Sequence, residues 1–163
     1  MGENDAKITK KRSNPPPNPV KPERRKKLRK ENKRLGELAE ANFLSKATSM
    51  GFHVSKPWGD SERYDFIVDV KGRIFRVQVK SAHVEAKCGG GYHIDCGRTR
   101  YRDAYTLDEI DMLVAYICPE DAWYIFPPSA FLTMGGVHLC TRGMKTSKYH
   151  RYREAWEAFY ENK

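Results

Sequence analysis

The chain lacks any long hydrophobic run. Among its 163 residues the longest apolar segment is Met112 to Cys118, far short of the roughly 20 residues that cross a bilayer. The first residues, Met-Gly-Glu-Asn-Asp, lack the apolar core of a signal peptide. We therefore expect no membrane-spanning segment and a cytoplasmic location.

Cysteine is also scarce. The four cysteines form no C-x-x-C pair and are too few for a disulfide framework, so reduced thiols are expected: Cys88, Cys96, Cys118 and Cys140. The side chains that suggest a zinc site are His83, Cys88, His93 and Cys96. Their spacing matches no established finger or ribbon, which disfavours structural zinc.

Acidic residues are few at the N-terminal end. Residues 1–34 hold 13 Lys or Arg against 4 Asp or Glu, whereas residues 35–163 hold 17 of each, so the net charge of +9 belongs to the first segment. This segment is proline-rich and has no hydrophobic period, which predicts a disordered basic arm over 1–34 and a folded domain over 35–163. Such an arm is typical of phosphate binding or of a solubilising tail. For the first use, the expected DNA contacts are Arg24, Arg25, Lys26 and Lys27.

Hydrophobic periodicity predicts an α/β fold. Apolar residues at helical spacing occupy 35–50, and Gly51 supplies a stop signal. Strands are expected at 52–57, 64–70, 74–82, 92–96, 98–102, 112–118 and 123–126, with 92–96 paired to 98–102. A short helix near 129–133 and an amphipathic helix over 149–160 complete the expected elements. Tyr152, Trp156 and Phe159 share one face of the last helix.

The strand expected at 74–82 carries an unusual polar face. Its alternation directs Arg76, Gln78 and Lys80 to one side of the sheet. If Lys71-Gly72 is a two-residue hairpin loop, counting back along the partner strand sets Asp65 opposite Gln78, whereas a bulge would change this register.

A carboxylate, an amide oxygen and an ammonium on one sheet face suit a hard cation that meets a phosphate. Mg²⁺ prefers oxygen ligands and is commonly held by one or two carboxylates together with substrate phosphate. Asp65 alone supplies too few ligands. Glu37 and Glu40, which share a face of the first expected helix, are the candidates for a second carboxylate.

These residues resemble a known family. Gly36-x-x-x-Glu40, then Asp65, then Gln78-Val-Lys80 is similar to the PD-(D/E)XK nuclease superfamily, in particular to the Q-x-K variant among group I intron homing endonucleases and archaeal Holliday-junction resolvases. The resemblance implies a restriction-endonuclease-like core of order α-β-β-β-α-β, in which helices flank a mixed sheet. It also implies a divalent-metal-dependent endonuclease that hydrolyses phosphodiester bonds in double-stranded or branched DNA.

The resemblance also implies a role for each motif residue. Glu40 and Asp65 would ligate Mg²⁺ or Mn²⁺, Gln78 would replace the usual second acidic ligand, the Val79 carbonyl would complete the set, and Lys80 would be the catalytic lysine. Because Gln78 is neutral, the motif is equally consistent with catalysis by one metal ion, with a metal-poor resting state and with two metal ions. The same substitution is the main argument for the alternative, a non-catalytic DNA-binding or assembly module.

Other features bear on partners. Arg98, Arg100 and Arg102 alternate to one side within the basic block 70–102 and are expected to face DNA phosphates, although pairing with the acidic block 103–140 is the alternative. One site per chain cannot cut both strands at once, which predicts a homodimer or homotetramer, joined by the apolar face of the last helix or by strand edges. The protein is expected to associate with the nucleoid when bound to DNA. All three tryptophans, Trp58, Trp123 and Trp156, are expected in core or rim packing.

Overall fold

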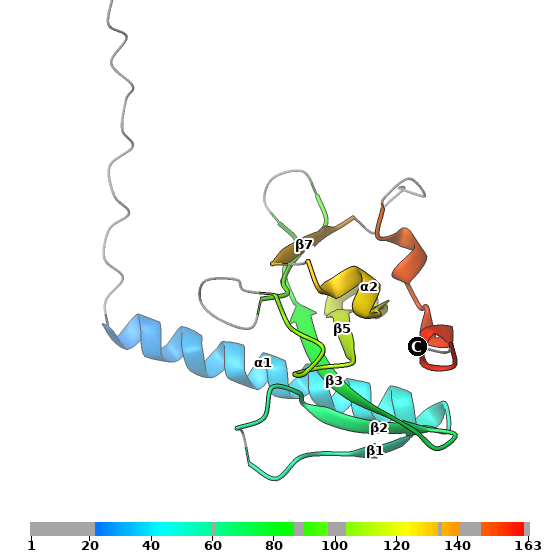
Figure 1. The fold of residues 1–163 in the computed structure, drawn as a ribbon. Coiled ribbons are helices and arrows are strands. Elements are labelled where there is room, and N and C mark those ends of the chain that lie inside the picture. Colours follow the sequence, from blue (N-terminus) through cyan, green and yellow to red (C-terminus); the bar gives the residue numbers. More distant parts are fainter. Residues whose placement is uncertain are drawn as a thin grey trace, which may run out of the picture.

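The computed structural model describes residues 22–59, 61–86, 90–97, 104–133, 135–140 and 148–161. The first elements in chain order are α1 (Pro22–Ser49), β1 (His53–Ser55), β2 (Phe66–Val70), β3 (Arg73–Ala82), β4 (Tyr92–Asp95) and β5 (Met112–Ile117). They are followed by η1 (Cys118–Glu120), β6 (Ala122–Phe126), α2 (Pro128–Phe131), β7 (Gly136–Leu139), η2 (His150–Tyr152) and η3 (Trp156–Phe159), where η denotes a 3₁₀ helix. Figure 1 shows these elements.

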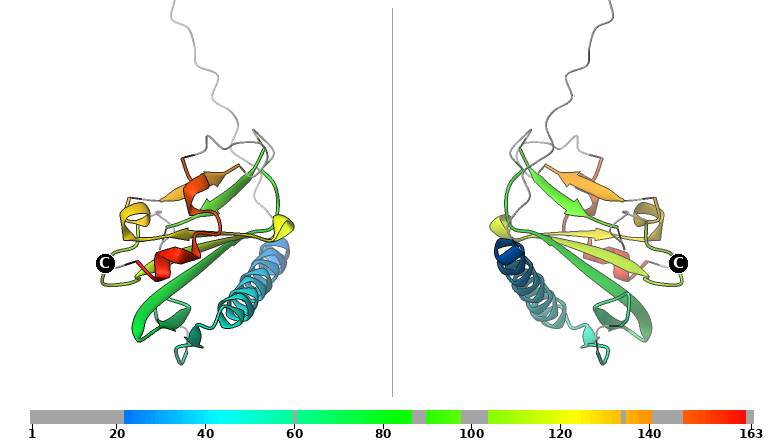
Figure 2. Two further views of the ribbon diagram at one scale, coloured as in Figure 1. Left: turned by 90° about the vertical axis from the view of Figure 1, so that its right-hand side faces the viewer. Right: turned by 90° about the vertical axis from the view of Figure 1, so that its left-hand side faces the viewer.

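The main sheet has five strands in the order β1-β2-β3-β5-β6. β3 and β5 are parallel, whereas the other neighbours are antiparallel. The long helix α1 lies against one face of this sheet (Figure 2). A mixed sheet flanked by helices is the fold class expected from the sequence, and the structure confirms it.

The β2–β3 hairpin has the register predicted from its two-residue loop. Val70 pairs with Arg73, and the pairing continues to Phe66 opposite Val77. Lys71 and Gly72 both have positive φ angles, of 54° and 82°, as a tight turn that matches strand twist requires. This turn fixes which residues stand opposite each other at the far end of the hairpin.

The sheet separates two hydrophobic clusters. One cluster lies under α1 and contains Phe43, Phe75 and Trp156. The other lies on the opposite face and contains Tyr105, Phe126 and Phe131. Because β5 and β6 are buried along their whole length, they read as continuous apolar runs, and the two expected strands at 112–118 and 123–126 are confirmed.

The start of the first helix differs from the expected one. α1 begins at Pro22 and not at Leu35, so residues 22–34 are helical, which is consistent with the high helix propensity of Lys, Arg and Glu. β4 pairs with β7, a partner that the sequence did not indicate, whereas its expected partner 98–102 lies outside the described residues. The division into an arm and a domain at residue 34 stays a prediction.

The C-terminal segment forms two short 3₁₀ helices in place of one amphipathic helix. Between them the backbone extends, and Arg153 bridges to Tyr124 of β6. Trp156 and Phe159 are buried in the cluster under α1. The expectation that this apolar face joins two copies is therefore wrong, since the face completes the core of its own chain.

Two further expectations can be compared with the described residues. Arg98, Arg100 and Arg102 lie outside the described residues. No described helix is both long and apolar enough to cross a membrane.

Candidate active site

Asp65 lies one residue before β2, where the hairpin pairing ends. Its Oδ2 atom accepts a hydrogen bond of 2.7 Å from the backbone N–H of Val79. The Asp65 backbone N–H donates to the carbonyl of Val77 at 2.9 Å. The carboxylate is thus held by the opposite strand at the position that the predicted register gave.

Gln78 connects the other expected ligands. Its Nε2 atom donates to Oδ2 of Asp65 and, at 3.2 Å, to the carbonyl of Val79. The side chain is only 9% exposed, so this amide is a buried polar group with its donors satisfied. In this conformation the nitrogen of the amide, and not its oxygen, faces the two oxygen atoms that the family resemblance assigns to a metal.

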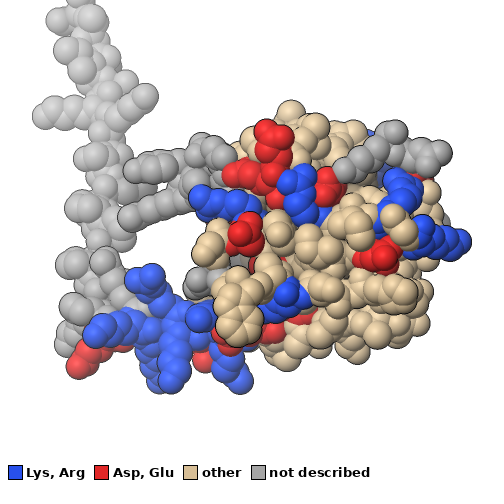
Figure 3. All heavy atoms as spheres, turned by 60° about the horizontal axis from the view of Figure 1, so that its bottom comes forward, with Lys and Arg blue, Asp and Glu red and all other residues tan. Residues whose placement is uncertain are grey.

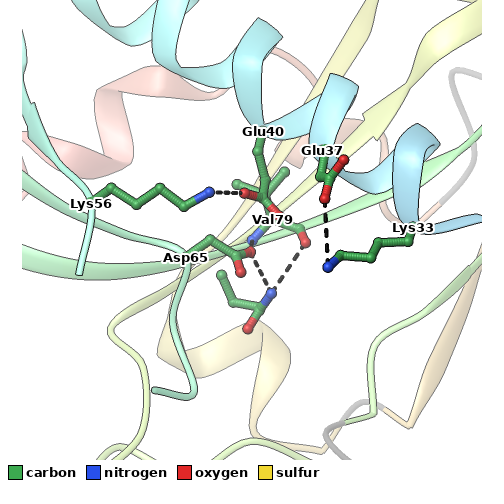
Figure 4. Close-up of polar contacts among 7 residues, drawn as sticks. Lys33, Glu37, Glu40, Lys56, Asp65 and Val79 are labelled. Atoms are coloured by element: carbon green, nitrogen blue, oxygen red, sulfur yellow. Dashed lines mark hydrogen bonds and ion pairs between the residues drawn. The ribbon is translucent and has the colours of Figure 1, made fainter. Parts of the chain in front are cut away.

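Glu40 reaches the site from α1. It lines the same pocket as Asp65, and its Oε2 atom forms an ion pair of 2.6 Å with Nζ of Lys56 (Figure 4). Glu37, the alternative carboxylate, is more exposed and pairs with Lys33 at 3.8 Å. Of the two candidates on this helix, the structure therefore favours Glu40 as the partner of Asp65.

These groups line an open pocket of about 410 Å³ between α1 and the segment that leads into β2. The α1 wall contains Asn32, Lys33, Gly36, Glu37 and Glu40. The opposite wall contains Lys56, Pro57, Gly59, Glu62, Tyr64 and Asp65. Two carboxylates from distant parts of the sequence, Glu40 and Asp65, thus face one solvent-accessible space.

The pocket perturbs the acidity of Asp65. Its pKa is raised from 3.8 to about 6, mainly by burial and to a smaller extent by the negative charge of Glu40. The hydrogen bond from Val79 and the charges of Lys80 and Lys56 lower it. A carboxylate that is costly to ionise next to a second carboxylate is a setting that a bound cation would relieve.

Lys80 lies two residues beyond Gln78 on the same side of β3. Its charge acts on Asp65, and its Nζ atom lies 5.6 Å from the ring centre of Tyr105. Arg76, the third member of the polar face, has a different role. It forms an ion pair of 3.0 Å with Asp111 and donates to the carbonyl of Leu107, so it anchors the segment before β5.

The oxygen donors at this site fit a hard divalent cation. Carboxylate oxygens of Glu40 and Asp65 and the carbonyl of Val79 are the ligand types that Mg²⁺ or Mn²⁺ accepts. Within the described part of the chain no group of three or more His, Cys, Asp or Glu side chains could hold a metal. Among the described residues, Glu40 and Asp65 are thus a pair of carboxylates, and the Val79 carbonyl is a neutral oxygen that could add to them.

The arrangement can be compared with known proteins. The family described as PD-(D/E)XK endonuclease matches residues 30–159. The chain belongs to this family. The crystal structure titled "The structure of a bacterial homing endonuclease: I-Ssp6803I" is 32% identical, with a TM-score of 0.67, and the match covers 76% of this chain and 89% of that one. No curated protein was found to match.

The site of this PD-(D/E)XK protein includes residues that the sequence did not single out. Lys56 follows β1 and neutralises Glu40. Its pKa is raised by the hydrogen bond to Glu40. No local pattern identifies Lys56, because only the tertiary fold brings it to α1.

Trp58 also departs from expectation. Its side chain is 102% exposed, so the prediction of core or rim packing is wrong for this tryptophan, whereas Trp123 and Trp156 are buried as predicted. Pro57 and Gly59 on either side line the pocket. The short turn-rich segment leaves the indole no neighbouring surface to pack on.

We predict that Asp65→Asn stabilises the protein in the presence of a chelator. The folded-state pKa of about 6 exceeds the unfolded value of 3.8, so the protonated carboxyl favours folding below about pH 4 and that contribution is lost as the pH rises through about 6. The melting temperature of Asp65→Asn should therefore exceed that of the wild type by a margin that grows between about pH 4 and pH 7.

Thermal unfolding followed by circular dichroism measures this margin. Glu62→Gln is the matched control, because it removes an exposed carboxylate from the same pocket. Its melting temperature should follow the wild type at each pH. An Asp65→Asn protein that melts below the wild type at neutral pH would contradict the prediction.

Proposed function

We propose that this protein is a divalent-metal-dependent endonuclease that hydrolyses phosphodiester bonds in double-stranded or branched DNA. The observation that carries the proposal is the meeting of Glu40 and Asp65 in one pocket, where the Val79 N–H of β3 holds the Asp65 carboxylate and the charge of Lys80 acts on it. These groups come from α1, from the start of β2 and from β3. Membership of an endonuclease family is consistent with this chemistry.

The residues that would hold Mg²⁺ or Mn²⁺ are Glu40, Asp65, Val79 through its carbonyl, and Gln78 once its amide oxygen faces the site. When bound, the cation would neutralise charge that develops on the nonbridging phosphate oxygen. Lys56 forms an ion pair with Glu40. The Gln78 amide likewise donates hydrogen bonds to Asp65 and to the Val79 carbonyl. We expect the contacts of Lys56 and of Gln78 to rearrange when a cation binds.

We assign to Lys80 the role of orienting the nucleophile, which is a water molecule. In hydrolysis the oxygen of a water molecule attacks phosphorus, the bond from phosphorus to the leaving oxygen breaks, and the water gives up a proton. An ammonium near the attacking water orients it and offsets the negative charge of the transition state. Lys80 suits this role because its charge acts on Asp65 and because its Nζ atom lies over the ring of Tyr105, at 5.6 Å from the ring centre.

Substrate binding extends beyond the pocket. We propose that Lys26 and Lys27, both exposed on α1, contribute to DNA affinity together with Arg24 and Arg25. The same role is proposed for Arg98, Arg100 and Arg102. Cleavage of both strands would need two copies, which we propose to associate through strand edges. The proposal places the protein in the cytoplasm, on the nucleoid when it is bound to DNA.

Lys80→Ala and Asp65→Asn should abolish cleavage but not DNA binding. The loss of either group removes a contributor to the transition state, and we expect the nicking rate of a supercoiled plasmid in Mg²⁺ to fall by at least about 100-fold. Binding to the same DNA in a chelator should change by less than about threefold, because phosphate contacts supply most of the affinity.

Lys71→Ala is the control for loss of a lysine, since Lys71 lies in the hairpin turn at the other end of β3. It should cleave at the wild-type rate. Wild-type protein that binds linear duplex and four-way junctions but nicks neither with Mg²⁺ or Mn²⁺ would overturn the nuclease proposal and favour a non-catalytic DNA-binding module.

Gln78→Glu should strengthen metal binding at a cost in stability. The substitution adds a third carboxylate where Gln78 now donates to Asp65, so repulsion should lower the melting temperature in a chelator. Mg²⁺ should then raise the melting temperature more than it does for the wild type, because binding to the folded state stabilises it.

Titration calorimetry with Mg²⁺ measures the affinity directly. Gln78→Met is the control, since it keeps the length of the side chain and removes the donor. It should lower the melting temperature without any gain in Mg²⁺ affinity. Equal Mg²⁺ affinity of Gln78→Glu and the wild type would show that position 78 does not reach the cation.

A further inference from the structure

The N-terminal part of α1 projects beyond the sheet (Figure 1). Every side chain from Lys26 to Arg34 is exposed, whereas the buried residues of this helix, Ala39, Phe43 and Ala47, all lie in its C-terminal half. A helical segment without packing partners is only marginally stable in water. Residues 22–34 also hold eight Lys or Arg against two Glu, so their charges repel each other and favour a polyanionic partner.

The cations on this segment are arranged on one face that leads to the pocket. Lys26, Lys30 and Lys33 are followed by Glu37 and Glu40 at steps of four, three, four and three residues, which place all five on one side of a helix. Lys33, Glu37 and Glu40 line the pocket. Figure 3 shows Lys and Arg side chains gathered along the projecting helix. We name Lys26, Lys30 and Lys33 the cationic stripe.

Gly36 lies between the stripe and Glu40. A Cβ atom at this position would meet no atom within 4 Å, so the packing of this chain does not require glycine. Glycine inside a helix is nevertheless about 1 kcal/mol less favourable than alanine. Because Gly36 lines the pocket, its missing side chain leaves room for the backbone of a substrate to approach the helix.

We propose that one strand of DNA lies along this face of α1, with successive phosphates against the cationic stripe and with the strand passing Gly36 to reach Glu40 and Asp65. The stripe is about 10 Å long, which spans about three phosphates of one strand. The helix thereby sets the direction from which DNA enters the pocket. The inference rests on the proposed function for DNA as the substrate, but the contacts along the helix do not depend on cleavage.

Two double variants of the full-length protein test the stripe. Lys26→Gln with Lys33→Gln removes two stripe cations. Lys27→Gln with Arg34→Gln removes two cations at the same spacing, rotated by about 100° around the helix. Each pair also breaks one exposed ion pair within the helix, Lys33–Glu37 or Arg34–Glu31. The two variants are thus matched in charge, in sequence segment and in lost helix contacts.

Fluorescence anisotropy with a labelled duplex, in a chelator and over a range of salt, measures binding without cleavage. The stripe variant should bind at least about tenfold more weakly near physiological salt. The slope of log affinity against log salt concentration should be smaller in magnitude by about 2. The variant of Lys27 and Arg34 should lose at least about threefold less affinity than the stripe variant, because we expect Lys27 to add only general attraction for phosphates from another side of the helix. Equal losses in both variants, or none in either, would overturn the proposal.

Gly36→Ala tests the approach of the strand. This variant should melt about 2–4 °C higher than the wild type and bind the same duplex at least about fivefold more weakly, because a methyl group now occupies the path of the backbone. A stabilised Gly36→Ala protein with wild-type affinity would show that the strand does not pass this position.

Trp58 reports whether DNA reaches the pocket. Its indole is exposed beside the wall opposite α1, whereas Trp123 and Trp156 are buried, so the red-shifted tryptophan emission belongs to Trp58. Duplex binding should change this emission in the wild type and not in Trp58→Phe. Binding that leaves the emission unchanged would overturn the path into the pocket. If these binding results hold while no DNA is nicked, DNA binding along the cationic stripe is supported and the nuclease proposal is wrong.

Discussion

The contact between Asp65 and the backbone of β3 is the constraint on which the candidate site depends. One carboxylate oxygen accepts hydrogen bonds from the Val79 N–H and from the Gln78 amide, so it is fixed relative to every side chain of that strand. The tight turn at Lys71-Gly72 sets this relation from about six or seven residues away along each strand, because it determines the register of the hairpin. A shift by one residue would turn Gln78 and Lys80 into the core and leave Asp65 without a partner.

Electrostatics links this fixed carboxylate to the rest of the pocket. Burial and Glu40 both disfavour the ionised form of Asp65, whereas Lys80 and Lys56 favour it. Lys56 binds Glu40 directly, and its ammonium partly occupies the charge-neutralising role that a divalent cation would take. Two carboxylates, Glu40 and Asp65, therefore lie close together among two lysine ammonium groups and one amide.

The sequence predicted the local part of this arrangement well. Two-residue periodicity and a Lys-Gly turn sufficed for the β2–β3 register, since both depend on neighbours in the chain. The pairing of β4 with β7, the exposure of Trp58 and the contact of Lys56 with Glu40 could not be predicted, because each depends on segments distant in sequence. The start of α1 was missed for another reason: an unpatterned basic run indicates disorder, although its residues individually favour helix.

The long helix α1 has two parts with different physical roles. Its C-terminal half is held by Ala39, Phe43 and Ala47 in the core, and this packing sets the position of Glu40. The side chains of residues 26–34 are all exposed, so this part of α1 is aligned because it continues the same helix. The exposed cations of residues 26–34 are therefore positioned relative to Glu40 by about 1.5 Å of rise per residue, so that one continuous helix links a cationic surface to the pocket.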